Sequence, residues 1–257
     1  MSKCIPEKWQ SWLKTEHLDN FESWWALSLE AVDETNLDRG GWSTVYTYRH
    51  KGKSFYVKRQ SNHLSRGFSS RLRKIPTFEM EFQQIGRYKK NEIPCIDPVF
   101  FETRKVGGES NLEYQAILVT EALEGWVALD RLLSGDEVIG YQNKVQLCAA
   151  LASSISHLHS AGIEHYNLYP KHIFVRPSAD GFEVRFIDLE TSRSNFGLLK
   201  KKCRDIETLS RRTTGISKAN RLRFLLQYFG KTRVDPQIRR AIGIIQKRSD
   251  RKNKRAS

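Results

Sequence analysis

One sequence feature constrains the fold of this chain most. It is a predicted helix followed by a polar loop and then by a predicted strand hairpin. Residues 142–160 predict a helix that ends just before a capping glycine, Gly162. Its apolar stripe consists of Val145, Cys148, Ala152, Ile155 and Leu158. The loop and first strand read HYNLYPKHIFV, residues 165–175, and a second strand pattern at 182–187 runs into Asp188-Leu189-Glu190. A polar loop between a helix and a hairpin that closes on acidic residues is a candidate functional site.

The composition excludes several classes of protein. With 257 residues, 39% of them hydrophobic, the chain can bury the core of one large domain or of two smaller lobes. It has no apolar run of about 18 residues, so we expect no membrane-spanning helix. We also expect no signal peptide, because the N-terminal stretch lacks an apolar core. Four scattered cysteines without a C-x-x-C pair argue against a zinc site or a disulfide framework and favour a reducing cytoplasm.

The net charge of +14 predicts an anionic partner. Residues 58–74 contain six Lys/Arg and no acid, and residues 231–257 contain ten Lys/Arg against two acids. Residues 102–140 are acidic instead, with eight Asp/Glu against three Lys/Arg. No nucleic-acid-binding motif accompanies the basic segments, so we do not expect a nucleic-acid partner.

A hairpin with a glycine-containing turn before it is predicted near the N-terminus. Residues 43–48 and 54–58 read as strands joined by a turn at 50–53. If Val45 is placed on the valine of the nucleotide-binding pattern G-x-G-x-x-G-x-V, Gly40 falls on the second glycine. Asp38 and Ser43 then fall on the first and third glycines. A plain hairpin turn would explain this weak glycine signal equally well.

Lys58 ends the second strand, and a helix pattern begins at Thr77. The helix has one apolar face, made by Phe78, Phe82, Ile85 and Tyr88. Glu81 is the first candidate partner for Lys58, and Glu79 is the second. The alternative is that all three are solvated surface charges. Further strands are expected at 94–102 and 114–120, and the latter ends in Glu121-Ala122-Leu123-Glu124-Gly125.

The pattern divides the chain into four parts. We expect an aromatic-rich extension at 1–35, a first lobe at 36–121, a second lobe at 122–240 and a disordered basic tail at 241–257. The extension contains Trp9, Trp12, Phe21, Trp24 and Trp25. It either docks on the first lobe or lies in a membrane interface. Its acidic residues favour docking.

The order of these features resembles the protein-kinase-like fold. The loop has the frame of the kinase catalytic loop H-R-D-L-x-x-x-N, and the acidic strand end stands where kinases have Asp-Phe-Gly. More closely, the chain resembles the lipopolysaccharide kinase (Kdo/WaaP) family, in its InaA-like branch, over roughly residues 37–210. The segments that carry the resemblance are GGWSTVY, YVKRQSNHLSR, PTFEMEFQQIGRY, LHSAGIEHYNLYPKHIFV and FIDLE. It implies an α+β, bilobal fold with a small antiparallel-sheet N-lobe carrying one helix and a mainly helical C-lobe.

The resemblance also implies ATP and Mg²⁺ as cofactors and assigns residue roles. The expected catalytic residues are Asn167, His165 and Lys171. The expected nucleotide-binding residues are Gly40, Gly41, Ser43, Lys58, Glu81, Glu121 and Leu123, the last two through the backbone of a hinge. The expected metal ligands are Asp188 and His172. For His172 a structural role, with its ring bonded to the backbone, is the alternative.

The loop departs from the kinase pattern at Asn167, which replaces the catalytic Asp. An amide can hold an acceptor hydroxyl but cannot take its proton, and loss of a general base costs about 10²–10⁴-fold in rate. Two hypotheses therefore stay open. One is a phosphotransferase that moves the γ-phosphate of ATP to a lipopolysaccharide or related glycan. The other is a weak or silent pseudokinase that binds a nucleotide or a partner and regulates.

The segment after the site is short. Sixteen residues lie between Asp188 and Asp205, and no A-P-E motif follows, which argues against a protein substrate. An anionic lipopolysaccharide core would suit the basic segments. We therefore expect a cytoplasmic protein, with possible peripheral contact at the inner face of the cytoplasmic membrane.

Overall fold

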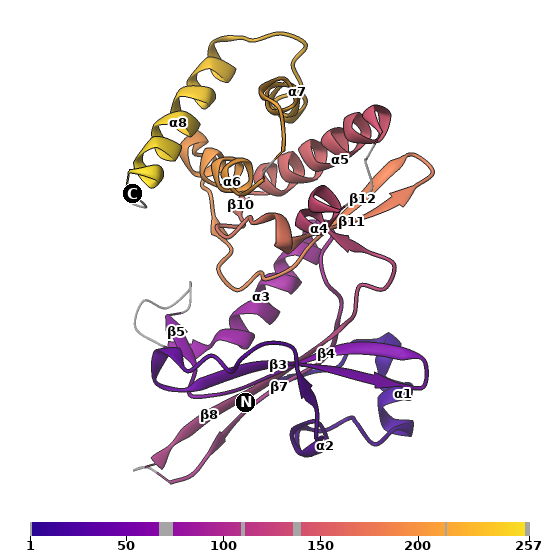
Figure 1. Ribbon diagram of the computed structural model, residues 1–257. Coiled ribbons are helices and arrows are strands. Elements are labelled where there is room, and N and C mark those ends of the chain that lie inside the picture. Colours follow the sequence, from indigo (N-terminus) through magenta and orange to yellow (C-terminus); the bar gives the residue numbers. More distant parts are fainter. Residues whose placement is uncertain (1, 67–73, 109–110, 136–139, 214, 255–257) are drawn as a thin grey trace. The chain divides into compact units, whose positions relative to one another are not determined.

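The computed structural model describes residues 2–66, 74–108, 111–135, 140–213 and 215–254 (Figure 1). The chain forms two compact units. Unit 1 comprises Met1–Arg87 and Ile96–Glu124, and unit 2 comprises Tyr88–Cys95 and Gly125–Ser257. The segment 1–35, which the sequence set apart as an extension, is thus an integral part of unit 1.

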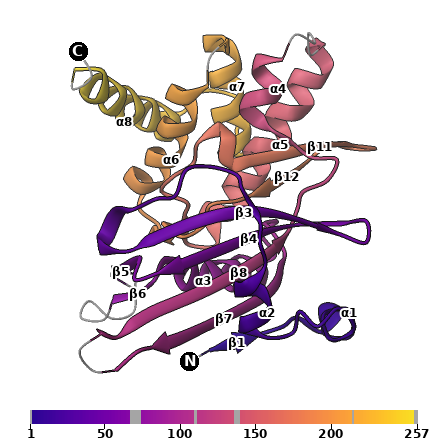
Figure 2. The same ribbon diagram turned by 60° about the horizontal axis from the view of Figure 1, so that its bottom comes forward.

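Unit 1 is built on one antiparallel sheet with the strand order β1-β7-β8-β4-β3-β2. Its strands are β1 Lys3–Cys4, β2 Glu30–Ala31, β3 Trp42–His50, β4 Lys53–Ser61, β7 Pro98–Val106 and β8 Glu113–Glu121. Figure 2 shows β3, β4, β8 and β7 following one another across the sheet. The strands predicted at 43–48, 54–58 and 114–120 are confirmed, each one or more residues longer at its ends. The strand predicted at 94–102 begins four residues later, at Pro98.

The aromatic N-terminal segment docks on this sheet. It forms α1 Glu7–Thr15 and α2 Phe21–Ala26. Trp9 and Trp24 are buried in one core cluster with Phe55 of β4. The guanidinium of the buried Arg59 donates to the backbone oxygens of Trp24 and Leu27, the latter at 2.9 Å. Docking is therefore the alternative that the structure shows, since the indoles are buried among core side chains.

A small two-stranded sheet precedes a long helix that begins in unit 1. Its strands are β5 Leu64–Arg66 and β6 Lys74–Pro76, and the helix is α3 Thr77–Lys90. Residues 67–73, which hold two of the six cations of the predicted basic segment, lie outside the described part of the chain. Of the segment's remaining cations, Lys58 and Arg59 make internal contacts, so they do not form a free basic surface.

Unit 2 is mainly helical. Its helices are α4 Leu129–Ser134, α5 Tyr141–Ser160, α6 Leu199–Arg212, α7 Lys218–Tyr228 and α8 Pro236–Asn253. Its strands are β9 Val127–Ala128, β10 Ile163–Glu164, β11 Ile173–Ser178, β12 Gly181–Phe186 and β13 Arg193–Ser194. They form a three-stranded sheet, β12-β11-β9, and a pair, β10-β13. The predicted stripe of α5 is its packing face, because Ala152, Ile155 and Leu158 are buried.

The expectation of a disordered tail at 241–257 is wrong for residues 241–253, which belong to α8. Asp235 caps the start of this helix by accepting from the amide of Ile238 at 2.9 Å. The helix packs on α6, with Ala241 buried and Arg248 bonded to Glu207 at 3.0 Å. The high charge of the segment concealed the periodic apolar face that docks it. Residues 255–257 lie outside the described residues, and in the described part of the chain no helix is long and apolar enough to cross a membrane.

Candidate active site

Lys58 and Glu81 form a close ion pair in unit 1. The Lys58 ammonium donates to both carboxylate oxygens of Glu81, at 2.6 and 2.7 Å. The exposed fractions of the two side chains are 15% and 3%. The first candidate partner is therefore the observed one, and the alternative of solvated surface charges is wrong for this pair. A mostly buried pair of this kind presents one cation in a fixed place, which suits an anionic ligand group.

The strand fixes the start of the helix that carries Glu81. Gln60, two residues after Lys58 on β4, accepts with its side-chain oxygen from the Phe78 amide at 2.8 Å and from the Thr77 hydroxyl at 2.9 Å. These bonds satisfy a donor at the N-terminus of α3, which would otherwise lack a partner. Because Lys58 and Gln60 point to the same side of the strand, the helix start lies beside the ammonium group.

The predicted glycine turn joins two antiparallel segments. Asn36 and Ser43 exchange both backbone hydrogen bonds at 2.9 Å. Gly40 has a φ of +78°, in the left-handed region, and a Cβ on Gly41 would lie 2.2 Å from the backbone oxygen of Ser61. Gly41 is therefore required by close packing against β4, whereas Gly40 serves the turn. Because the Ser43 amide is engaged within the turn, contact between this amide and a nucleotide is not supported.

The hinge residues lie at the end of β8. The backbone amide of Glu121 donates to the backbone carbonyl of Asp97 at 2.9 Å, and the Glu121 carboxylate accepts from the Lys8 ammonium at 2.5 Å. The Ala122 backbone amide donates to the backbone carbonyl of Ser54 at 2.9 Å. Adenine recognition by Glu121 and Leu123 stays a prediction, and the Glu121 amide is already bonded to the Asp97 carbonyl.

Asp205 anchors the polar loop in unit 2, and the sequence did not identify this function. Its carboxylate is fully buried and accepts from the backbone amides of His165 and Tyr166 at 2.7 and 2.8 Å. His159 donates to the same carboxylate at 3.2 Å. The sequence signal that could have identified it is an acidic residue on the apolar face of the cationic helix α6. The loop therefore begins at a fixed position, although forty residues separate the bonded partners.

The side chain of His165 is fully buried. Its Nε2–H donates to the Ile187 carbonyl at 3.0 Å, which ties the loop to the residue before Asp188. Burial lowers the pKa of His165, so the ring is neutral near pH 7. The catalytic role expected for His165 stays a prediction, and its contact with the Ile187 carbonyl suits an orienting part in that role.

Asp188, Asn167 and His172 converge in unit 2. The Asn167 amide nitrogen lies 3.4 Å from Asp188 Oδ2, and His172 Nδ1 lies 3.2 Å from the same oxygen. His172 Nδ1 also lies 2.9 Å from the Asn167 backbone oxygen. A nitrogen facing two acceptors carries the proton, so this nitrogen cannot be a metal ligand. This contact is the one expected under the alternative for His172, a structural role with its ring bonded to the backbone.

The donor set fits a magnesium ion held with substrate oxygens. Asp188 is the one carboxylate of the trio, and a third of its side chain is exposed. Mg²⁺ is commonly bound by one or two carboxylates together with phosphates and water. In the part of the chain that the structure describes, no three His, Cys, Asp or Glu side chains gather into a complete metal cage. Ligation by His172 stays a prediction and would require its other ring nitrogen.

Lys171 and Tyr169 complete the loop. Lys171 is exposed on a 3-10 turn, Pro170–His172, and its ammonium is thus accessible to a ligand. The Tyr169 ring packs against the ring of His172, with centroids 5.4 Å apart, and the Arg212 guanidinium lies 5.3 Å from the Tyr169 ring centroid. Contact of Lys171 with a transferred phosphate stays a prediction.

Comparison with known proteins identifies the family and the fold of the chain. The model of the lipopolysaccharide kinase (Kdo/WaaP) family matches residues 22–228. The protein InaA of Escherichia coli (strain K12) is 30% identical over 204 residues, which cover 79% of this chain and 92% of InaA. A solved structure of WaaP in complex with acyl carrier protein has a TM-score of 0.72 at 20% identity, covers 98% of this chain and 99% of its own, and shows the same bilobal kinase-like fold. By its sequence and its fold, the chain belongs to the lipopolysaccharide kinase (Kdo/WaaP) family.

Proposed function

We propose that the protein is an ATP- and Mg²⁺-dependent phosphotransferase that phosphorylates a hydroxyl of a lipopolysaccharide core or a related anionic glycan. The observation that carries the proposal is the Lys58–Glu81 ion pair. A lysine held at a fixed place by a buried carboxylate is the device with which kinases position ATP phosphates. Family membership supports the class of reaction.

In the proposal, Lys58 binds phosphate oxygens of ATP and Glu81 holds its ammonium in place. Asp188 holds Mg²⁺, which neutralises charge on the phosphates when it is bound. Asn167 orients the acceptor hydroxyl by a hydrogen bond, and Lys171 contacts the transferred phosphate. Phosphoryl transfer depends mainly on positioning and charge neutralisation, so these residues can support a reaction of reduced rate without a general base.

The proposed substrate indicates where in the cell the protein acts. Lipopolysaccharide is anchored in a membrane, so we propose that the protein acts at the inner face of the cytoplasmic membrane as a peripheral protein. The excess of cations, +14 overall, supports attraction to an anionic surface.

Phosphate transfer from labelled ATP to purified core oligosaccharide, with and without Mg²⁺, tests the proposal. We expect Mg²⁺-dependent labelling by the wild type and none by Lys58→Ala. Lys53→Ala is the matched control, because Lys53 is an exposed lysine on the same strand. Labelling that persists in Lys58→Ala would contradict the assignment.

Asn167 favours a second candidate, a silent kinase-like protein that binds nucleotide and regulates a partner. The Asn167 amide donates toward Asp188, and no carboxylate occupies the position of the general base. This candidate predicts binding of Mg-ATP without transfer to any glycan. Isothermal titration with Mg-ATP beside the labelling assay separates the two candidates.

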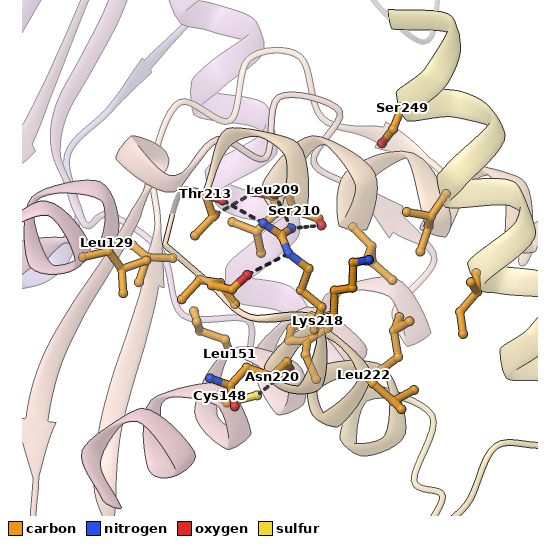
Figure 3. Close-up of a pocket in the computed structure, with 18 of the residues that line it drawn as sticks. Leu129, Cys148, Leu151, Leu209, Ser210, Thr213, Lys218, Asn220, Leu222 and Ser249 are labelled. Atoms are coloured by element: carbon orange, nitrogen blue, oxygen red, sulfur yellow. Dashed lines mark hydrogen bonds between the residues drawn. The ribbon is translucent and has the colours of Figure 1, made fainter. Parts of the chain in front are cut away.

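An apolar pocket within unit 2 supports one partner, an acylated carrier. Its volume is about 500 Å³, within the range of about 300–1,000 Å³ common for ligand pockets. Figure 3 shows Leu129, Leu151 and Leu209 among its walls, with Leu222 of α7 across from them. Two exposed lysines, Lys144 and Lys218, belong to the lining. Apolar walls fit an acyl chain, and the cations beside them fit anionic groups of the carrier to which the chain is attached.

The comparison structure of WaaP contains acyl carrier protein, and we infer that this chain also binds a carrier through its acyl chain. Leu222→Trp would fill the pocket and should weaken binding of an acylated carrier at least about tenfold. Gln227→Trp, at an exposed position of the same helix, should not change binding. Equal binding of acylated and unacylated carrier by the wild type would contradict the inference.

A further inference from the structure

The turn that leads into α6 carries an apolar tip that the proposed chemistry does not use. Phe196 and Leu198 at this tip have exposed fractions of 73% and 54%. Between Glu190 and Asp205 the chain has five Lys/Arg and no acid. We call residues Asn195–Lys202 the basic tip.

The basic tip is held in place by hydrogen bonds. Asn195 is buried and donates from its side chain to the carbonyls of His159 and Ile163, at 2.7 and 3.1 Å. Its side-chain oxygen accepts from the Gly197 amide at 2.7 Å. Phe196 has a φ of +51°, a conformation that non-glycine residues seldom adopt. The backbone therefore presents an aromatic side chain to solvent from a fixed turn.

The cations of the basic tip surround its apolar side chains. The Lys201 ammonium lies 4.2 Å from the Phe196 ring centroid and donates to the Ser194 carbonyl at 3.0 Å. Lys200 is exposed, and Lys202 is partly exposed. An aromatic ring with ammonium groups beside it matches the boundary between lipid headgroups and acyl chains.

The basic tip is connected to the catalytic loop. Strand β13, which precedes it, pairs with β10, and the residue after β10 is His165. Anything that binds the basic tip is therefore held close to the loop within the same unit. A membrane at this place would present a lipid-anchored acceptor to Asn167.

We propose that the basic tip docks on an anionic lipid bilayer, with Phe196 and Leu198 entering the interface and Lys200 and Lys202 contacting headgroups. Two exposed apolar side chains are too few for a stable protein interface, which buries about 1,000 Å² or more. Binding to a bilayer requires no complementary shape, and each cation near an anionic surface adds separately to the binding free energy. The proposal deepens the proposed function, because it assigns the acceptor to the membrane surface.

Sedimentation with vesicles tests the proposal. We expect wild-type protein to bind vesicles of phosphatidylcholine containing a third phosphatidylglycerol, and to bind pure phosphatidylcholine far less. Phe196→Ser should weaken binding about tenfold, through loss of apolar burial, and Phe196→Trp should retain it. Lys200→Glu should weaken binding about tenfold or more. Lys252→Glu on α8 is the matched control and should bind within about twofold of wild type, since it changes the same charge elsewhere.

Activity on two acceptors separates this proposal from the proposed function. Phe196→Ser should phosphorylate soluble core oligosaccharide like the wild type but lipopolysaccharide in vesicles about tenfold more slowly. If the wild type labels neither acceptor, the proposed function fails, while the vesicle sedimentation still decides the docking. The docking proposal is overturned if Phe196→Ser and Lys200→Glu bind anionic vesicles as the wild type does, or if Lys252→Glu alone loses binding.

Discussion

Removal of the Asp205 carboxylate should release the catalytic loop. The carboxylate accepts two backbone amides, at 2.7 and 2.8 Å, and is fully buried. In Asp205→Ala both amides lose their acceptor, and each buried unsatisfied donor costs about 1–3 kcal/mol. We therefore expect a loss of about 2–6 kcal/mol, against a total stability of about 5–15 kcal/mol for a typical protein. Asp205→Asn keeps one acceptor oxygen and should lose roughly half as much.

Denaturant unfolding followed by circular dichroism measures these losses, and hydrogen exchange at His165 and Tyr166 locates them. Both amides should exchange much faster in Asp205→Ala. Asp235→Ala is the matched control, because Asp235 accepts one amide at the start of α8 and is partly exposed. Loss of such a cap costs about 1 kcal/mol. The reasoning is refuted if Asp205→Ala destabilises no more than Asp235→Ala, or if the two loop amides stay protected.

Three further predictions concern glycine packing, nucleotide binding and pH. Gly41→Ala should destabilise by about 1–3 kcal/mol in denaturant unfolding, because its Cβ would meet β4 backbone at 2.2 Å. Gly86→Ala, in open space on α3, should instead stabilise by about 0.5–1 kcal/mol. Mg-ATP should raise the melting temperature of the wild type and of Lys53→Ala but not that of Lys58→Ala, and identical shifts would contradict the assignment. The pKa of His165 is lowered by burial, so below about pH 6.5 the unfolded chain binds a proton that the folded chain does not. Stability should therefore fall as pH drops through this value, less steeply in His165→Gln, and parallel melting curves against pH would contradict this.

Contacts that follow from local periodicity could be predicted from the sequence. Lys58 lies on a predicted strand and Glu81 on a helix whose apolar face is clear, so both elements followed from periodicity. Their pairing followed from the resemblance to kinases. The hairpin of β11 and β12 was predictable for the same reason, since its alternating residues and turn are contiguous.

Contacts that depend on distant packing could not be predicted. Arg59 reads as part of a basic surface, but its guanidinium is buried against the N-terminal segment. Asp205 reads as one acid in a cationic helix, and its partners lie forty residues earlier. The charge of residues 241–253 indicated disorder, although Ile238 and Ala241 are buried when α8 docks on α6. In each case tertiary burial outweighed the local charge pattern.

The structure also qualifies the meaning of Asn167. Its amide nitrogen lies 3.4 Å from Asp188 Oδ2, so a carboxylate at this position would face a like charge. Any gain from Asn167→Asp therefore requires saturating Mg²⁺, which offsets that repulsion.

Single-turnover transfer from Mg-ATP to core oligosaccharide, in wild type, Asn167→Asp and Asp188→Ala, tests the central claim most directly. The account predicts slow transfer by the wild type and a rate about tenfold higher or more in Asn167→Asp, because a general base is restored. It predicts no transfer by Asp188→Ala, which lacks the carboxylate that holds the metal. Absence of transfer in all three proteins, with the correct acceptor present, would contradict the assignment as a phosphotransferase.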